Sequence, residues 1–282
     1  MARSLNSTFG SPTVAGRRRR RRATVAPATG YSRWAWLGGL TGLLVAIVVF
    51  APAAWLAHGV ATASQGSVIL ADARGTLWNG SAQLILTGGA GSKDSTALPE
   101  RLEWSLRPSF TGLRGEVRPT CCASQATKLD AKARWGGGQI DVSDLDIRLP
   151  AELLVGLGTP WNTLNLQGQL SLRSPQLSAQ WVEGRSLIEG GLSLEMLSVS
   201  SRLSTLHPLG DYRVDLTGGT TPRINLQTLK GALQLSGSGE WVGTRMRFLG
   251  EASATPEYEA ELANLLSIIG RRRDGKSIIS LG

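Results

Sequence analysis

Histidine and cysteine are scarce in this sequence of 282 residues, which contains only two of each. The histidines are His58 and His207, and the cysteines are the neighbours Cys121 and Cys122. This supply is too small for most transition-metal sites and for nucleophiles that pair cysteine with histidine. The sequence also lacks the G-x-S-x-G, P-loop and H-E-x-x-H motifs. We therefore expect neither an enzyme nor a bound cofactor or metal.

Acidic residues are missing from residues 1–71, whereas eight arginines occur there. Seven of them stand just before an apolar segment: Arg17, Arg18, Arg19, Arg20, Arg21, Arg22 and Arg33. The rest of the chain has 22 basic residues against 21 acidic ones, so eight of the nine formal positive charges belong to this N-terminal arm. The arm lacks the interleaved aromatic residues and folded support of a nucleic-acid surface. A nuclear signal would conflict with a membrane segment, and a twin-arginine signal needs a different apolar continuation. These arginines therefore indicate a topology signal.

Charged residues are also missing from residues 35–57, an apolar run of 23 residues. A helix of this length extends about 34 Å, enough for a bilayer core of roughly 30 Å. Trp34 and Trp36 flank one end and Trp55 the other, as expected at the headgroup level. We predict a single transmembrane helix here, with residues 1–34 in the cytoplasm by the positive-inside rule.

Two features of this region leave alternatives open. Residues 61–63, Ala-Thr-Ala, resemble a signal-peptide cleavage site, although the arm and the apolar run are longer than those of signal peptides. Gly38 and Gly42 form a GxxxG pair, which suits a helix–helix contact in a homodimer, although glycine is common in membrane helices.

Long helical patterns are rare after a connector at residues 58–65. Apolar and polar residues alternate instead, most clearly over residues 164–173, and a phase change predicts a bulge near Ser143 and Asp144. We predict strands at residues 67–71, 75–87, 102–106, 129–135, 139–149, 164–173, 176–182, 186–199, 211–217, 232–236 and 243–249.

Two short helices are expected within this region, over residues 150–157 and 256–269. The second carries an apolar stripe, suited to packing on a sheet or to docking a partner. Dense strands with few helices predict a mainly β domain over residues 66–282, either an antiparallel β-sandwich or a curved open sheet. Its near-neutral charge suits protein partners better than nucleic acid.

Residues 66–80, GSVILADARGTLWNG, resemble the "GTLW.G" segment of the type II secretion system protein N family. Residues 102–106, 241–250 and 263–271 resemble later family segments in the same order. The resemblance implies an accessory component of the bacterial inner membrane, used in the export of folded proteins. Its periplasmic domain would contact inner-membrane platform proteins, the outer-membrane secretin or both. The resemblance carries no catalytic residues, and the arginine arm departs from it.

Two tryptophans are candidate partner contacts. Trp78 lies in the GTLWNG segment and Trp161 follows Pro160 in an expected loop, so either side chain suits a binding hot spot or the core. The alternative function is periplasmic lipid handling or transfer, with acyl chains lying in an apolar groove of the β domain.

Two further clusters have open interpretations. The neighbouring cysteines could bond to each other, link two chains or remain thiols, because a bridge between adjacent residues is short of the usual Cα separation. Asp141, Asp144 and Asp146 could attract calcium, although alternate acidic residues on a strand are usually its solvated side.

Overall fold

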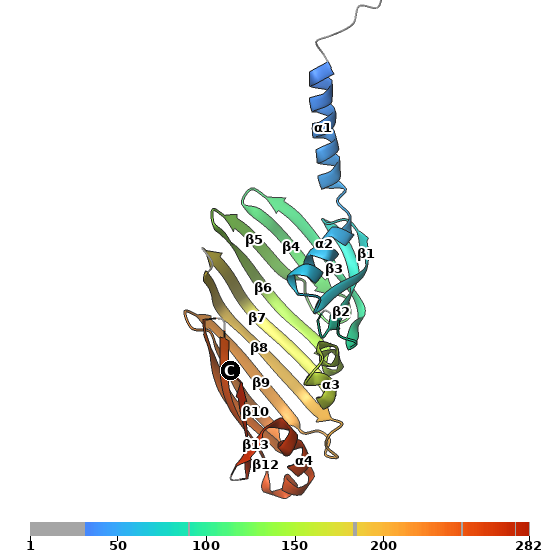
Figure 1. The fold of residues 1–282 in the computed structure, drawn as a ribbon. Coiled ribbons are helices and arrows are strands. Elements are labelled where there is room, and N and C mark those ends of the chain that lie inside the picture. Colours follow the sequence, from blue (N-terminus) through green and yellow to red (C-terminus); the bar gives the residue numbers. More distant parts are fainter. Residues whose placement is uncertain (1–31, 90, 183–184, 244, 274, 282) are drawn as a thin grey trace, which may run out of the picture. The chain divides into compact units, whose positions relative to one another are not determined.

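The computed structural model describes residues 32–89, 91–182, 185–243, 245–273 and 275–281. The chain divides into two compact units, Met1–Val45 and Ala46–Gly282. The second unit contains one large sheet, with short helices along its margin (Figure 1).

The apolar N-terminal segment forms two helices instead of one. α1 spans Ser32–Val49 and α2 spans Ala53–Ala63, and Pro52 between them pairs with Thr76 in an isolated β-bridge. Proline has no backbone N–H to continue the hydrogen-bond pattern of α1, which explains the break. The prediction of one continuous helix over residues 35–57 is therefore wrong. Among the residues that the structure describes, no helix combines the length and the apolar character needed to cross a membrane.

Fourteen strands form one antiparallel sheet, in the order β1 to β12 followed by β14 and β13. The first seven are β1 Val68–Gly75, β2 Asn79–Thr87, β3 Ser95–Ser109, β4 Gly112–Pro119, β5 Thr127–Arg134, β6 Gly137–Pro150 and β7 Leu166–Val182. The others are β8 Arg185–Ser201, β9 Gly210–Gly219, β10 Arg223–Gly231, β11 Leu233–Val242, β12 Arg245–Ala254, β13 Arg271–Arg273 and β14 Lys276–Leu281. A mainly β fold built on an open sheet is thus confirmed.

Four short helical elements lie in the connections: η1 Ala151–Leu157, α3 Trp161–Leu164, η2 Pro256–Tyr258 and α4 Glu259–Ile269. Both helices expected in the β region are present, the first as a 3-10 helix and the second as η2 followed by α4. All four elements follow an even-numbered strand, so they lie at one edge of the sheet.

The bulge predicted near Ser143 and Asp144 is present as a local irregularity without a register shift against β7: Asp144 has a left-handed φ of 59°. This residue lies opposite Pro175 of β7, between paired residues on either side. Proline cannot donate to a strand ladder, so the irregularity occurs in both strands at the same level. The apolar residues of β6 therefore change from even to odd numbers and remain on one face of the sheet.

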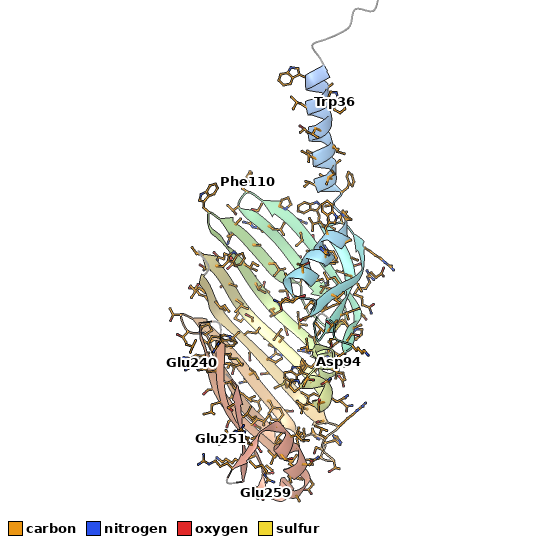
Figure 2. All side chains as sticks on the ribbon, in the orientation of Figure 1. Trp36, Asp94, Phe110, Glu240, Glu251 and Glu259 are labelled. Atoms are coloured by element: carbon orange, nitrogen blue, oxygen red, sulfur yellow. A yellow bond between two sulfur atoms is a disulfide. The ribbon has the colours of Figure 1, made fainter. Side chains whose placement is uncertain are left out.

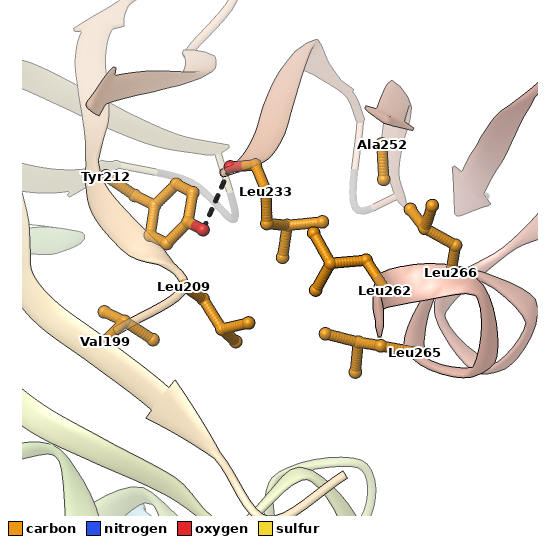
Figure 3. Packing of buried hydrophobic residues seen from close by; sticks show 8 residues of the cluster. All are labelled: Val199, Leu209, Tyr212, Leu233, Ala252, Leu262, Leu265 and Leu266. Carbon is orange, nitrogen blue, oxygen red and sulfur yellow. Dashed lines mark hydrogen bonds between the residues drawn. The ribbon is translucent and has the colours of Figure 1, made fainter. Parts of the chain in front are cut away.

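A cluster of buried residues lies between α4 and the sheet. It comprises Val199, Leu209, Tyr212, Leu233, Ala252, Leu262, Leu265 and Leu266 (Figure 3). Within it the hydroxyl of Tyr212 donates to the carbonyl oxygen of Leu233 at 3.0 Å. The interpretation that the apolar stripe of this helix packs on the sheet is confirmed.

A second cluster lies between α2 and the first strands. Its buried residues are Ala53, Leu70, Ala82, Trp104 and Leu106. Leu56, Ala57 and Val60 of α2 pack against them, so residues 53–63 belong to the folded unit and most of the predicted connector is helical.

Candidate functional site

The strands give the sheet one apolar and one polar face, because residues paired in neighbouring strands share a face. Trp104, in the cluster beneath α2, pairs with Val117, and the same face can be followed through successive pairs. We call it the apolar face. At the margins of the two clusters it carries Leu113, Val117 and Leu226, and between the clusters it carries Leu129, Val142, Leu177, Leu194 and Val214.

These eight side chains are only half-buried. The described helices pack mainly on β1–β3, β7 and β12–β14, so most of the apolar face of β4–β6 and β8–β10 has no layer of described residues over it. Figure 1 shows this central region between α2 and α4. Contiguous uncovered apolar area on a folded domain is typical of an interaction surface.

Charges alternate in sign across the opposite, polar face. Arg114 pairs with Asp130 at 3.3 Å, and Lys132 lies 3.8 Å from Asp130 and 3.2 Å from Asp141. Further along, Arg213 pairs with Glu195 at 2.7 Å. Each exposed pair contributes only about 0.2–1 kcal/mol, so this ladder favours the strand register more than it stabilises the fold.

Asp141 is a largely buried acidic residue of this ladder, and its pKa is shifted. Burial raises the pKa of its carboxyl group, but hydrogen bonds from Gln139, Ser178 and Lys132 outweigh that effect and hold the pKa below its usual value. The carboxylate is therefore a structural hydrogen-bond acceptor at neutral pH.

The acidic residues considered as calcium ligands each have a basic neighbour. Asp141 faces Lys132, Asp144 lies 2.8 Å from Lys128, and Asp146 lies 3.6 Å from Arg173. Within the described ranges, no group of three or more histidine, cysteine, aspartate or glutamate residues could hold a metal ion.

From β1 to β12, the connections from odd-numbered to even-numbered strands project from one edge of the sheet, which we call the hairpin edge. Phe110 at the β3–β4 turn and Trp135 at the β5–β6 turn are fully exposed, at 111% and 104% (Figure 2 labels Phe110). Trp181 and Val182, at the end of β7, are also exposed. Sequence reasoning missed these residues, although Trp135 precedes three glycines and its position in a turn was visible.

The two tryptophans chosen from the sequence are built into the domain. Trp78 donates its Nε1–H to the carbonyl oxygen of Val48 at 2.8 Å and packs against the cluster beneath α2. Trp161 begins α3 and is half-buried. Their role as partner contacts stays a prediction.

The residues expected to act in the membrane segment lie in different parts of the chain. Gly38 and Gly42 are one turn apart on α1, where a Cβ at either would have nothing within 4 Å. The run Arg17–Arg22 lies outside the described residues, and Arg33 is in α1. The helix–helix contact and the topology signal remain predictions.

Cys121 and Cys122 are bonded to each other, with their Cα atoms 3.7 Å apart. The alternatives of a link between chains and of two free thiols are therefore wrong. The pair lies in the β4–β5 connection, where the carbonyl oxygen of Cys122 accepts the N–H of Arg148 at 2.7 Å. This contact ties the connection to β6.

Comparison with known proteins gives one family match. The model of a family described as "Type II secretion system (T2SS), protein N" matches residues 66–281. Neither the curated proteins nor the solved structures contain a match. The matched range includes every strand from β1 to β14 and begins after α2.

Proposed function

This chain belongs to the type II secretion system protein N family, and we propose that its β domain contacts inner-membrane platform proteins, the outer-membrane secretin or both. Family membership makes the chain an accessory component of the secretion machinery that associates with other components. The observation that carries the proposal is the uncovered apolar face of β4–β6 and β8–β10. Burial of such a surface against a partner is favourable, because it removes apolar area from water.

We further propose that α1 is inserted in the inner membrane, with residues 1–34 in the cytoplasm and the chain from Ala53 onward in the periplasm. Leu43, Leu44 and Val49 point in different directions around α1, yet all are exposed, at 50% or more. A helix that is apolar on every side is favoured in lipid. The arginine-rich arm stays on the cytoplasmic side by the positive-inside rule.

Crosslinking in intact cells tests the partner proposal. A photoreactive residue at Leu129 or Leu194 lies on the apolar face, and one at Asp130 lies on the polar face as a matched control. We expect adducts with platform proteins or the secretin from the first two positions, and export should fall in a Leu129→Glu variant but not in Asp130→Ala. Equal adducts from both faces would contradict the proposal.

The orientation has its own test. A reporter that works only in the cytosol, fused after residue 282, should be inactive, and the same reporter fused before residue 17 should be active. Activity at the C-terminal end would remove the periplasmic location while leaving the family assignment in place.

A second candidate function is lipid handling in the periplasm, with acyl chains on the same apolar face. It is favoured by the length of that face between the two clusters, from Leu129 in β5 to Val214 in β9. Mass spectrometry of the purified full chain should then detect bound phospholipid, lost in the Leu129→Glu variant. If the native chain carries no lipid and the Leu129→Glu variant loses its protein crosslinks, the first function is favoured.

A further inference from the structure

The hairpin edge carries two large aromatic side chains that contribute nothing to the core. Phe110 and Trp135 stand at turns separated by two strand spacings, which is roughly 10 Å. Full exposure of such side chains to water is unfavourable, by about 25 cal/mol for each Å² of apolar surface. Tryptophan in particular favours the headgroup level of a bilayer.

Like charges stand beside the first aromatic. Arg107 of β3 and Arg114 of β4 are both exposed and are paired directly across the two strands, close to Phe110. Like charges in this position destabilise a sheet, and the ion pair of Arg114 with Asp130 at 3.3 Å on its other side offsets part of that repulsion. An anionic surface at the hairpin edge would reverse the sign of that effect, because lipid phosphates attract each nearby basic side chain by about 1 kcal/mol.

The chain enters the folded unit at the same edge. The carbonyl oxygen of Val48 accepts the Nε1–H of Trp78, and the carbonyl oxygen of Trp78 accepts the N–H of Leu106 at 2.6 Å. Leu106 is only four residues from Phe110 along β3, which is about 13 Å in an extended strand. Val48, which belongs to the folded unit, is therefore held close to the hairpin edge.

α1 is slightly shorter than the hydrocarbon core of the bilayer in which we propose that it is inserted. Its 18 residues extend about 27 Å, whereas the hydrocarbon core is roughly 30 Å thick. A helix shorter than the core is accommodated by local thinning of the bilayer, which draws whatever follows the helix toward the headgroups. This step rests on the proposed insertion of α1.

We infer that the hairpin edge is a membrane-contact surface for the anionic bilayer that receives α1. Phe110 and Trp135 lie at headgroup depth, and Arg107 and Arg114 lie near lipid phosphates. The strands then lead away from the membrane; the 17 residues of β7 extend up to about 55 Å. The opposite edge, with α3 and α4, is presented to partners deeper in the periplasm.

Fluorescence quenching in vesicles tests this inference with the full chain. Single substitutions Leu43→Cys, Phe110→Cys, Trp135→Cys and Ser267→Cys are labelled with an environment-sensitive dye, without reductant, so that the Cys121–Cys122 bond stays closed. Each protein is reconstituted in vesicles of phosphatidylethanolamine and phosphatidylglycerol that contain a lipid quencher at headgroup depth. Leu43 reports insertion of α1, and Ser267 on α4 is the control from the far edge.

We expect quenching at Phe110 and Trp135 to exceed that at Ser267 by at least about threefold, with strong quenching at Leu43 as well. Equal values at all three domain positions, with Leu43 quenched, would overturn the inference and leave the insertion of α1 intact. An unquenched Leu43 would instead overturn the insertion itself.

The basic residues have a separate control in the same assay. Replacing Arg107 and Arg114 together by glutamine should reduce quenching at Trp135 by about twofold or more, because the attraction to phosphatidylglycerol is lost. An unchanged value would refute the contribution of the two arginines. Both side chains are exposed, so the double variant is expected to fold.

Discussion

Leu262→Ala is the sharpest test of how the C-terminal helix is held. Leu262 is completely buried between α4 and the sheet, where its neighbours are the leucines shown in Figure 3. Truncation removes three carbon atoms and leaves a cavity, which costs about 2–5 kcal/mol at buried leucines. Taking about 3 kcal/mol, local opening of α4 becomes roughly 100-fold more frequent, since each 1.4 kcal/mol is a factor of ten.

Hydrogen exchange measured by mass spectrometry on a peptide covering residues 259–269 reports that opening directly. Ile268→Ala is the matched control, because Ile268 lies on the same helix, loses the same number of carbon atoms and is 49% exposed. We expect its exchange to change by less than about threefold. Similar acceleration in both variants would refute the packing argument and favour the alternative in which α4 is a docking helix.

Three other substitutions, one of them with a matched control, have defined outcomes. Tyr212→Phe removes the donor to a buried carbonyl oxygen and should lower the free energy of unfolding in urea by about 1 kcal/mol. Asp141 has a lowered pKa, so its contribution is present above its usual pKa of 3.8 and is lost as the pH falls through the lowered value. Asp141→Asn should therefore cost up to about 1 kcal/mol at pH 7, and its stability should converge with that of the native chain in acid. Gly156→Ala would force a Cβ against the backbones of β2 and β3 and destabilise the domain, whereas a Cβ at Gly191 makes only an ordinary contact and Gly191→Ala should be tolerated in thermal unfolding.

The membrane segment shows where hydropathy stops being informative. Residues 53–57 are as apolar as the residues before them, because Ala53 and Ala57 pack against strands and not against lipid. Both environments select the same side chains, so composition alone cannot separate them. Pro52 was the available signal, since a proline at that position can begin a new helix as easily as it can end a span.

The missed strands have different causes. In β4 the apolar alternation is interrupted at Gly115, where a Cβ would overlap the side chain of Leu106, so the glycine that makes room for packing also hides the pattern. In β10 the alternation of Ile224 and Leu226 with polar residues was present and could have been recognised. Strand existence was thus largely predictable, whereas the exposure of Phe110 depends on where the turns project and was not.

The two faces of the sheet together explain why the domain is preorganised for binding a partner. On the polar face, ion pairs connect β4 through β9 and oppose slippage of the register, which would turn every side chain to the other face. On the apolar face, α2 and α4 cover the two ends and leave the middle open. A surface held in this way loses little conformational entropy on binding, and such preorganisation strengthens association without adding contacts. Because Leu129 is only half-buried, a charge at that position should weaken the association more than it weakens the fold.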